Sequence, residues 1–488
     1  MSVDGTFDSK IDYYKKHEHD SLVQKACSVL SSLQIPSLYA EGIQRNRIHY
    51  EIFNQYPAYS LLSNISEEKV FSHRHYPHSP HKEQKQSIAL YLHLPFCLKK
   101  CTFCCFFSTT DWQSADIDIY LKYLEREMAL VSQKPSMRGR EISSLYWGGG
   151  TPMVLDTVHI DRLMKMLHNS FSMRSNAECI CEATPETISE KKIECFLKNG
   201  FNRLSIGIQT FNDELLRSYN RLYSRAEVIE SFNKSKKTGF SHINIDLMFG
   251  LAGQTLQTWR ESLEIVAHLQ PQNITFYPFS DSFNKTVMSQ NAETVFPTEE
   301  EKLLMHVMAI EKMVEMGYIQ ISPYQFIVSW KFPYAHQEFK AINGEVYALG
   351  VTGHSFLNNC DYHNHHSLKN YQKSLEQNIL PIKCGRALNK KEVMVRYIIY
   401  GLQKTSGINR RYSGVNKKVF QERFGVSIDY EFHKELKHLK QLKLLVDTTD
   451  TIRLSYQGLL YATETSLFFY SEEDRKKINR LNLSADLK

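Results

Sequence analysis

From about residue 87 onward the chain alternates between short apolar runs and longer amphipathic stretches. SIALYLHLPF, SSLYWGG, ECICEAT, RLSIGIQT, HINIDLMFG and NITFYPFS predict buried strands. The stretches between them, such as IDIYLKYLEREMALV and TLQTWRESLEIVAHLQ, carry helical periodicity. Strands and helices in this order form parallel βαβ units. Six such units predict an α/β fold in the form of a partial, TIM-like (β/α)6 barrel.

Polar and small residues gather where the predicted strands end. A cysteine loop follows the first strand, GGGTP follows the second, and EATP ends the third. Gln209 closes the fourth strand, and Asp246 lies inside the fifth, where its side chain can point inward. Because function in such barrels sits at the carboxyl ends of the strands, these features predict one shared site.

The flanking regions follow other patterns. Residues 1–86 predict an accessory region with weak helical patterning that ends in a polar linker, SHRHYPHSPHKEQKQS. Its histidines (His73, His75, His78 and His81) could bind a metal, but a solvated linker is favoured. We assign residues 87–385 to the barrel. Residues 386–488 predict helices followed by a hairpin, LLVDTTDTIRLS, and a further helix, an order that resembles a winged-helix module.

Composition places the chain among soluble globular proteins. Of its 488 residues 42% are hydrophobic and 23% charged, and the formal net charge is +6. The polar start MSVDGTFDSK predicts no signal peptide, and no long apolar run predicts a membrane span. Ten cysteines without a secretory signal indicate a reducing, cytoplasmic compartment. The scattered cysteines (Cys27, Cys179, Cys181, Cys195, Cys360 and Cys384) are interpreted as small buried hydrophobic residues.

The cysteine loop, YLHLPFCLKKCTFCCFF, carries the most specific chemistry. Cys97, Cys101 and Cys104 can supply three thiolates to a four-iron cluster and leave the fourth iron open. Zinc is the alternative, but it is usually held by four ligands, and no second ligand pair follows Cys105. Cys104 and Cys105 are adjacent in the sequence, so the two thiols cannot both bind one small cluster without strain. We therefore favour an iron–sulfur cluster.

The C-x3-C-x2-C spacing after a first strand resembles the signature of radical S-adenosylmethionine (SAM) enzymes. YLHLPFC, YWGGGTP, EATP, GFNRLSIGIQTFNDELL and NIDLMFGLAGQT, with the C-terminal module, resemble the oxygen-independent coproporphyrinogen III oxidase family. The likeness spans about residues 87–470. It implies a radical SAM barrel in which a [4Fe-4S] cluster cleaves SAM reductively, giving a 5′-deoxyadenosyl radical that takes hydrogen from the substrate.

The resemblance also implies roles for individual residues. Cys97, Cys101 and Cys104 would hold the cluster. Tyr91 and Phe103 match aromatic positions around the cluster and SAM. The remaining SAM contacts that it implies are Gly148, Gly149, Gly150, Thr151 and Glu182 around the methionine amino group, and Gln209, Arg221 and Asp246 toward ribose and carboxylate.

One departure from the family bears on the reaction. The decarboxylases carry a cysteine two residues after the third ligand, where this chain has Phe106, and the extra thiol stands at Cys105. Relatives that act as haem chaperones tend to carry aspartate where Cys105 stands. Cys105 could be a buried filler or a catalytic thiol beside the substrate. This mismatch favours one-carbon transfer from a second SAM molecule to an aromatic or unsaturated small molecule. Porphyrinogen decarboxylation and haem degradation or binding are the alternatives.

The expected partners are a small-molecule substrate, tetrapyrroles included, and an electron donor such as flavodoxin or ferredoxin. Lys434, Lys437, Lys440 and Lys443 lie on one side of a predicted helix, but no base-reading motif accompanies them, so nucleic acid binding is not expected. In YHNHHSLKNY, His363, His365 and His366 near Cys360 could bind metal or haem. A structural turn before a helix is the favoured interpretation.

Overall fold

One large sheet forms the centre of the molecule. The computed structural model describes residues 6–43, 45, 55–71, 87–279, 295–341, 344–404 and 414–485. Twelve strands lie in the order β12-β11-β10-β9-β1-β2-β3-β4-β5-β6-β8-β7. The six central strands are parallel, as the alternating pattern predicts. They are β1 (Ser87–Leu94), β2 (Glu141–Gly149), β3 (Ser172–Ala183), β4 (Arg203–Gln209), β5 (His242–Phe249) and β6 (Asn273–Pro278).

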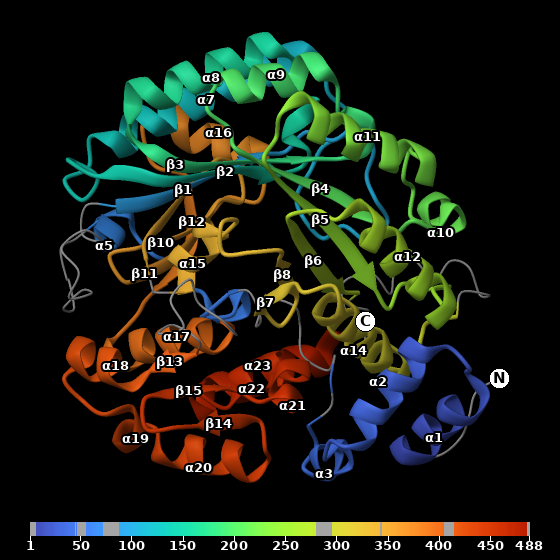
Figure 1. The fold of residues 1–488 in the computed structure, drawn as a ribbon. Coiled ribbons are helices and arrows are strands. Elements are labelled where there is room, and N and C mark those ends of the chain that lie inside the picture. Colours follow the sequence, from blue (N-terminus) through green and yellow to red (C-terminus); the bar gives the residue numbers. More distant parts are fainter. Residues whose placement is uncertain are drawn as a thin grey trace.

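The helices between these strands cover the outer face of the sheet. Figure 1 shows α7, α8 and α9 side by side over β1 to β3. Polar caps begin several of them: Ser224 and Glu227 exchange side-chain and backbone hydrogen bonds at the start of α11. The helices are α7 (Ser114–Ser132), α8 (Thr157–Ser170), α9 (Glu190–Lys198), α10 (Asp213–Ser218), α11 (Arg225–Thr238), α12 (Leu256–Leu269) and α14 (Glu299–Glu315).

Short strands that the sequence pattern did not reveal extend the sheet at both edges. β9 pairs parallel to β1, and the other added strands pair antiparallel. The segment expected to be a turn begins inside β11, which ends at Asn364, and then bends at His366 and Ser367 into α16 (Leu368–Glu376) as expected. The added elements are β7 (Ile319–Ser322), β8 (Gln325–Ile327), α15 (Ala335–Ala341), β9 (Val346–Leu349), β10 (His354–Leu357), β11 (Cys360–Asn364) and β12 (Ile382–Ala387).

The N-terminal region is more helical than its sequence pattern indicates. Its second helix packs against α14, and Lys25 pairs with Glu311 at 3.0 Å across that contact. The linker histidines lie outside the described residues. The N-terminal elements are α1 (Phe7–His17), α2 (Ser21–Ser31), α3 (Ile35–Ala40), the short helix η1 (Tyr59–Leu61) and α5 (Glu67–Phe71).

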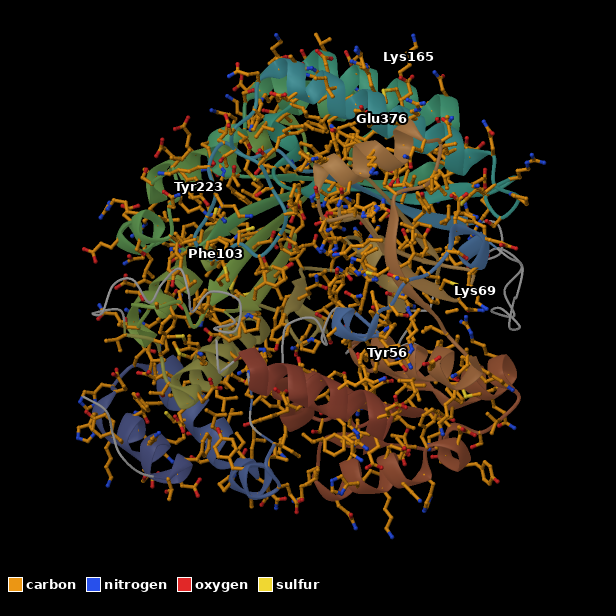
Figure 2. The ribbon with its side chains drawn as sticks, turned by 180° about the vertical axis from the view of Figure 1, so that it is seen from behind. Tyr56, Lys69, Phe103, Lys165, Tyr223 and Glu376 are labelled. Carbon is orange, nitrogen blue, oxygen red and sulfur yellow. The ribbon has the colours of Figure 1, made fainter. Side chains whose placement is uncertain are left out.

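The C-terminal module has the predicted helices and hairpin, and one further helix. It lies next to the N-terminal region: Tyr56 contacts Tyr470 with ring centroids 4.8 Å apart, and Figure 2 shows Tyr56 beside the C-terminal helices. Lys440 pairs with Asp447 at 2.8 Å, so it is not a free cation. Its elements are α17 (Lys390–Leu402), β13 (Val415–Asn416), α18 (Lys417–Phe424), α19 (Ile428–Glu431), α20 (His433–Gln441), β14 (Leu445–Asp447), β15 (Thr451–Leu454), α21 (Tyr456–Leu460), α22 (Ala462–Leu467) and α23 (Glu472–Ala485).

Candidate functional site

The loop between β1 and α7 presents three thiols to one cavity. Cys97, Cys101 and Cys104 are each partly exposed and line a cavity of about 270 Å³. The loop is tied down at both ends, because the Trp112 indole donates to the Cys97 carbonyl at 2.8 Å and the Asn220 amide donates to the Lys100 carbonyl at 2.7 Å. These bonds hold the backbone of the loop at Cys97 and Lys100, and all three cysteines line the same cavity.

Burial controls the protonation of two of the three thiols in this loop. Burial raises the pKa of the Cys97 and Cys101 thiols, so both are protonated in the metal-free protein at neutral pH. The positive charge of Arg221 opposes that rise at Cys101. Bound iron would replace these protons, since thiolates are the ligands that iron–sulfur clusters use. The donor set therefore fits a cluster held by three cysteines.

Two half-buried carboxyl groups, those of Glu182 and Asp246, line the same cavity. Burial raises the pKa of Glu182 to about 7, although Glu182 accepts hydrogen bonds from the Tyr146 hydroxyl at 2.6 Å and from the Gly149 amide at 3.3 Å. Burial also raises the pKa of Asp246 to about 6, against hydrogen bonds from Asn244 at 2.7 Å and Ser205 at 3.0 Å. A ligand with an ammonium or hydroxyl groups would complement both carboxylates.

The glycine loop after β2 is packed against the cysteine loop. The Gly150 amide donates to the Leu94 carbonyl at 2.8 Å, and the Thr151 amide donates to the Phe96 carbonyl at 2.8 Å. A Cβ atom on Gly150 would stand 2.6 Å from the Phe96 carbonyl oxygen, so only glycine fits there. Gly149, Gly150 and Thr151 line the cavity, whereas Gly148 lies behind it beside Glu182.

Arg221 brings a buried guanidinium to the cavity wall. It lies between two aromatic rings, 5.1 Å from the Phe103 ring centroid and 5.7 Å from that of Tyr223, and Figure 2 shows these two rings on the same side of the molecule. Its Nε atom is buried without a hydrogen-bond partner among the described residues. An unsatisfied guanidinium in a cavity fits a carboxylate ligand.

Gln209 closes β4 with a left-handed φ of 72°, a strained conformation that is typical of functional positions.

A second, larger cavity of about 730 Å³ adjoins the first. Cys105, Phe106, Glu182 and Tyr277 line both cavities. Tyr91, expected beside SAM, lines the larger cavity and not the smaller one. Sequence reasoning missed most of the larger cavity, because its walls come from segments far apart in the chain. They include Gln55, Tyr59, Tyr146, Tyr277, His336, His354, His363 and Lys404.

Cys105 lies where the two cavities meet. Its side chain is exposed, so the interpretation as a buried filler is wrong. The scattered cysteines are buried as expected, except that Cys384 is only partly buried.

Comparisons with known proteins agree with this site. Residues 91–266 match the radical SAM superfamily. The heme chaperone HemW of Bacillus subtilis is 29% identical over 391 residues, which cover 78% of this chain and 99% of that protein. The oxygen-independent coproporphyrinogen III oxidase of Escherichia coli is 28% identical over 362 residues, covering 71% of this chain and 78% of that protein. The solved structure of that Escherichia coli oxidase, HemN, a radical SAM enzyme, superposes with a TM-score of 0.72 and 26% identity, covering 87% of this chain and 99% of that one.

Fold, cysteine loop and comparisons define a radical SAM protein, a class whose cofactors are a [4Fe-4S] cluster and SAM. Within that class, the chain is similar over most of its length to the HemN and HemW proteins. The comparisons do not support the one-carbon transfer expected from the sequence. Within the described part of the chain, no helix is long and apolar enough to span a membrane.

Proposed function

We propose that the smaller cavity holds both cofactors. Cys97, Cys101 and Cys104 would hold the cluster, because their thiols face one space. Once bound, the cluster would supply the electron for reductive cleavage of SAM, the chemistry from which hydrogen abstraction starts. A reduced flavodoxin or ferredoxin would deliver that electron.

The side chains around the cavity would orient SAM. Glu182 would accept hydrogen bonds from the methionine ammonium, and the Arg221 guanidinium would pair with the methionine carboxylate. Asp246 and Gln209 would bind the ribose hydroxyls, and Phe103 would pack beside the sulfonium cation. The glycine loop, held by the Leu94 and Phe96 carbonyls, would let the ligand approach the backbone. These contacts fix where the radical forms, close to the residues that the two cavities share.

The larger cavity would hold the substrate, and a tetrapyrrole fits it best. A volume of about 730 Å³ lies within the usual range for ligand pockets. Aromatic rings from β1, β2 and β6 line it and suit a flat macrocycle. Lys404 also lines it, and its charge interacts with that of Glu338 in the same cavity wall. Burial lowers the pKa of Lys404 and the charge of Glu338 opposes that shift, and a tetrapyrrole carboxylate would further stabilise the charged form.

We infer that the reaction removes a hydrogen atom from a carboxylate-bearing side chain of a porphyrinogen, with loss of carbon dioxide. The single observation that carries this proposal is the shared wall of the two cavities, because a tetrapyrrole in the larger cavity would lie beside the SAM site in the smaller one. Cys105 lies in that wall, where its thiol could exchange a hydrogen atom with the substrate. Loss of carbon dioxide requires removal of one further electron, which an external acceptor must take.

Haem binding or breakdown is the second candidate. His354, His363 and His366 line the larger cavity, and imidazole is a common haem ligand. One similar protein is a haem chaperone. Haem would fill the same space as a porphyrinogen, so the two candidates differ in substrate and not in site.

Product analysis tests the proposal. The reconstituted protein, SAM and a reductant are incubated without oxygen with either coproporphyrinogen III or haem. Decarboxylation predicts 5′-deoxyadenosine and carbon dioxide with the porphyrinogen alone. Haem binding with little SAM cleavage would favour a chaperone, and S-adenosylhomocysteine would favour one-carbon transfer. If neither tetrapyrrole binds nor increases deoxyadenosine formation, the proposal is wrong.

A further inference from the structure

A compact group of metal-ligating side chains lies in the β10–β11 hairpin, away from the cysteine loop. His354 on β10 pairs with His363 on β11, and Asp361 stands two residues before His363. Cross-strand partners and residues two apart on a strand share a face, so all three side chains lie on one face of the hairpin. Their candidate ligand atoms lie within 4.8 Å of one another.

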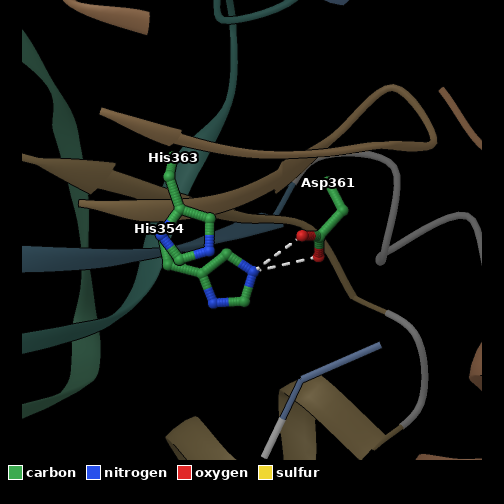
Figure 3. A group of neighbouring side chains, drawn as sticks. All are labelled: His354, Asp361 and His363. Atoms are coloured by element: carbon green, nitrogen blue, oxygen red, sulfur yellow. Dashed lines mark hydrogen bonds and ion pairs between the residues drawn. The ribbon is translucent and has the colours of Figure 1, made fainter. Parts of the chain in front are cut away.

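The geometry within the group is close. The His354 Nε2 atom lies 3.0 Å from each carboxylate oxygen of Asp361, as Figure 3 shows. The His354 and His363 rings are stacked with centroids 4.3 Å apart and an angle of 5° between their planes. To aim both nitrogens at one ion, one ring must turn about its Cβ–Cγ bond, a soft torsion.

Burial and neighbouring groups favour a site over a surface ion pair. The Asp361 side chain has no exposed area, and that of His354 is 26% exposed, toward the larger cavity. The Gln55 amide donates to His363 Nε2 at 2.9 Å and to Asp361 at 3.4 Å. The Tyr59 ring packs edge-on against His363 with centroids 5.0 Å apart. In known metal sites the second ring nitrogen of a ligating histidine donates its hydrogen, so metal binding through His363 Nδ1 would turn the Gln55 amide to present its oxygen to Nε2.

We propose that His354, Asp361 and His363 bind a divalent first-row transition metal ion. Two imidazoles and one carboxylate suit Zn²⁺, Fe²⁺ or Mn²⁺, and such sets leave coordination positions open. His354 and His363 both line the larger cavity, so the open positions face its contents. Oxygen ligands such as water or a substrate carboxylate would complete the coordination. Coordination by a substrate carboxylate rests on the proposed function, whereas metal binding by the three side chains does not.

The test uses the full chain with Cys97, Cys101 and Cys104 all replaced by serine, which removes binding at the cluster site. This protein is stripped with a chelator and titrated with Zn²⁺ by calorimetry, and with Co²⁺ by absorption spectroscopy. We expect about one ion per chain. His354→Ala and His363→Ala should each weaken binding by about 100-fold or more, because each removes a ligand.

His365→Ala is the matched control, because His365 is a neighbouring histidine outside the group, and it should bind as the parent does. Circular dichroism and thermal unfolding confirm that each variant folds. His354→Ala keeps the proposal testable if the more buried His363→Ala fails to fold, since His354 is partly exposed. The absence of stoichiometric binding in the folded parent would overturn the proposal. Equal affinity in parent and His354→Ala would also overturn it and indicate a His–Asp ion pair only.

Discussion

The pKa of Glu182 makes SAM binding depend on pH. Burial raises this pKa from about 4.5 to about 7, so half of the carboxyl groups are protonated at pH 7. Only the carboxylate pairs favourably with the methionine ammonium, so binding below pH 7 must expel a proton. The ionised fraction falls from about one half at pH 7 to about 3% at pH 5.5. We therefore expect protonation of Glu182 alone to raise the Kd for SAM about 16-fold between these pH values, and protonation of Asp246 to add at most about fourfold.

The assay is anaerobic equilibrium binding of SAM to the reconstituted protein from pH 5.5 to 7. In this range the amino group of SAM stays protonated, because α-amino groups titrate near pH 8. Glu182→Gln should bind SAM more weakly at pH 7. Its remaining pH dependence should be at most about fourfold, the part that Asp246, with a pKa of about 6, can supply. A Kd that is constant across this range in the unmodified protein would refute the reasoning.

Four further predictions concern other parts of the molecule. Cys101→Ala should lose the cluster absorbance and deoxyadenosine formation; product that persists would refute the ligand assignment. Gly150→Ala should weaken SAM binding at least about tenfold in isothermal titration, because its Cβ atom would displace the Phe96 backbone; unchanged affinity would argue against this. Lys404→Met should weaken porphyrinogen binding by about 1–3 kcal/mol in fluorescence titration and leave SAM affinity unchanged; equal affinity would place the substrate carboxylates elsewhere. Glu127→Ala should lower the free energy of unfolding in urea by about 2–4 kcal/mol. The reason is that this buried carboxylate accepts hydrogen bonds from the Gly350 amide at 2.8 Å and from the Tyr371 hydroxyl at 2.6 Å. A smaller loss would mean that water takes the place of the carboxylate.

The parallel half of the sheet could be predicted from the sequence because its strands are buried on both faces. β1 is buried at nearly every position and reads as a continuous apolar run. β7 has four residues, all only partly buried, and β8 has three, too few to show a period. The N-terminal helix α1 buries only Phe7 and Ile11, so its apolar face is narrow and its pattern weak.

The two cavities also differed in how far they could be predicted from the sequence. The cysteine loop and the glycine loop are local sequence motifs, and their places at strand ends bring them together. The larger cavity has no local motif, since Gln55, His354 and Lys404 meet only through the pairing of β9 to β12 beside β1 and the packing of the C-terminal module. His363 was noticed as part of a histidine cluster, but its partner His354 was not, because only the hairpin register joins them.

We propose that a radical formed beside the cysteine loop acts on a tetrapyrrole in the adjoining cavity. The most direct measurement uses coproporphyrinogen III deuterated in its propionate side chains. Mass spectrometry of the 5′-deoxyadenosine formed under anaerobic turnover then reports where its hydrogen came from. We predict deuterium in the deoxyadenosine, in amounts that match the substrate consumed. Deoxyadenosine that forms at the same rate without the substrate and carries no deuterium would contradict the account.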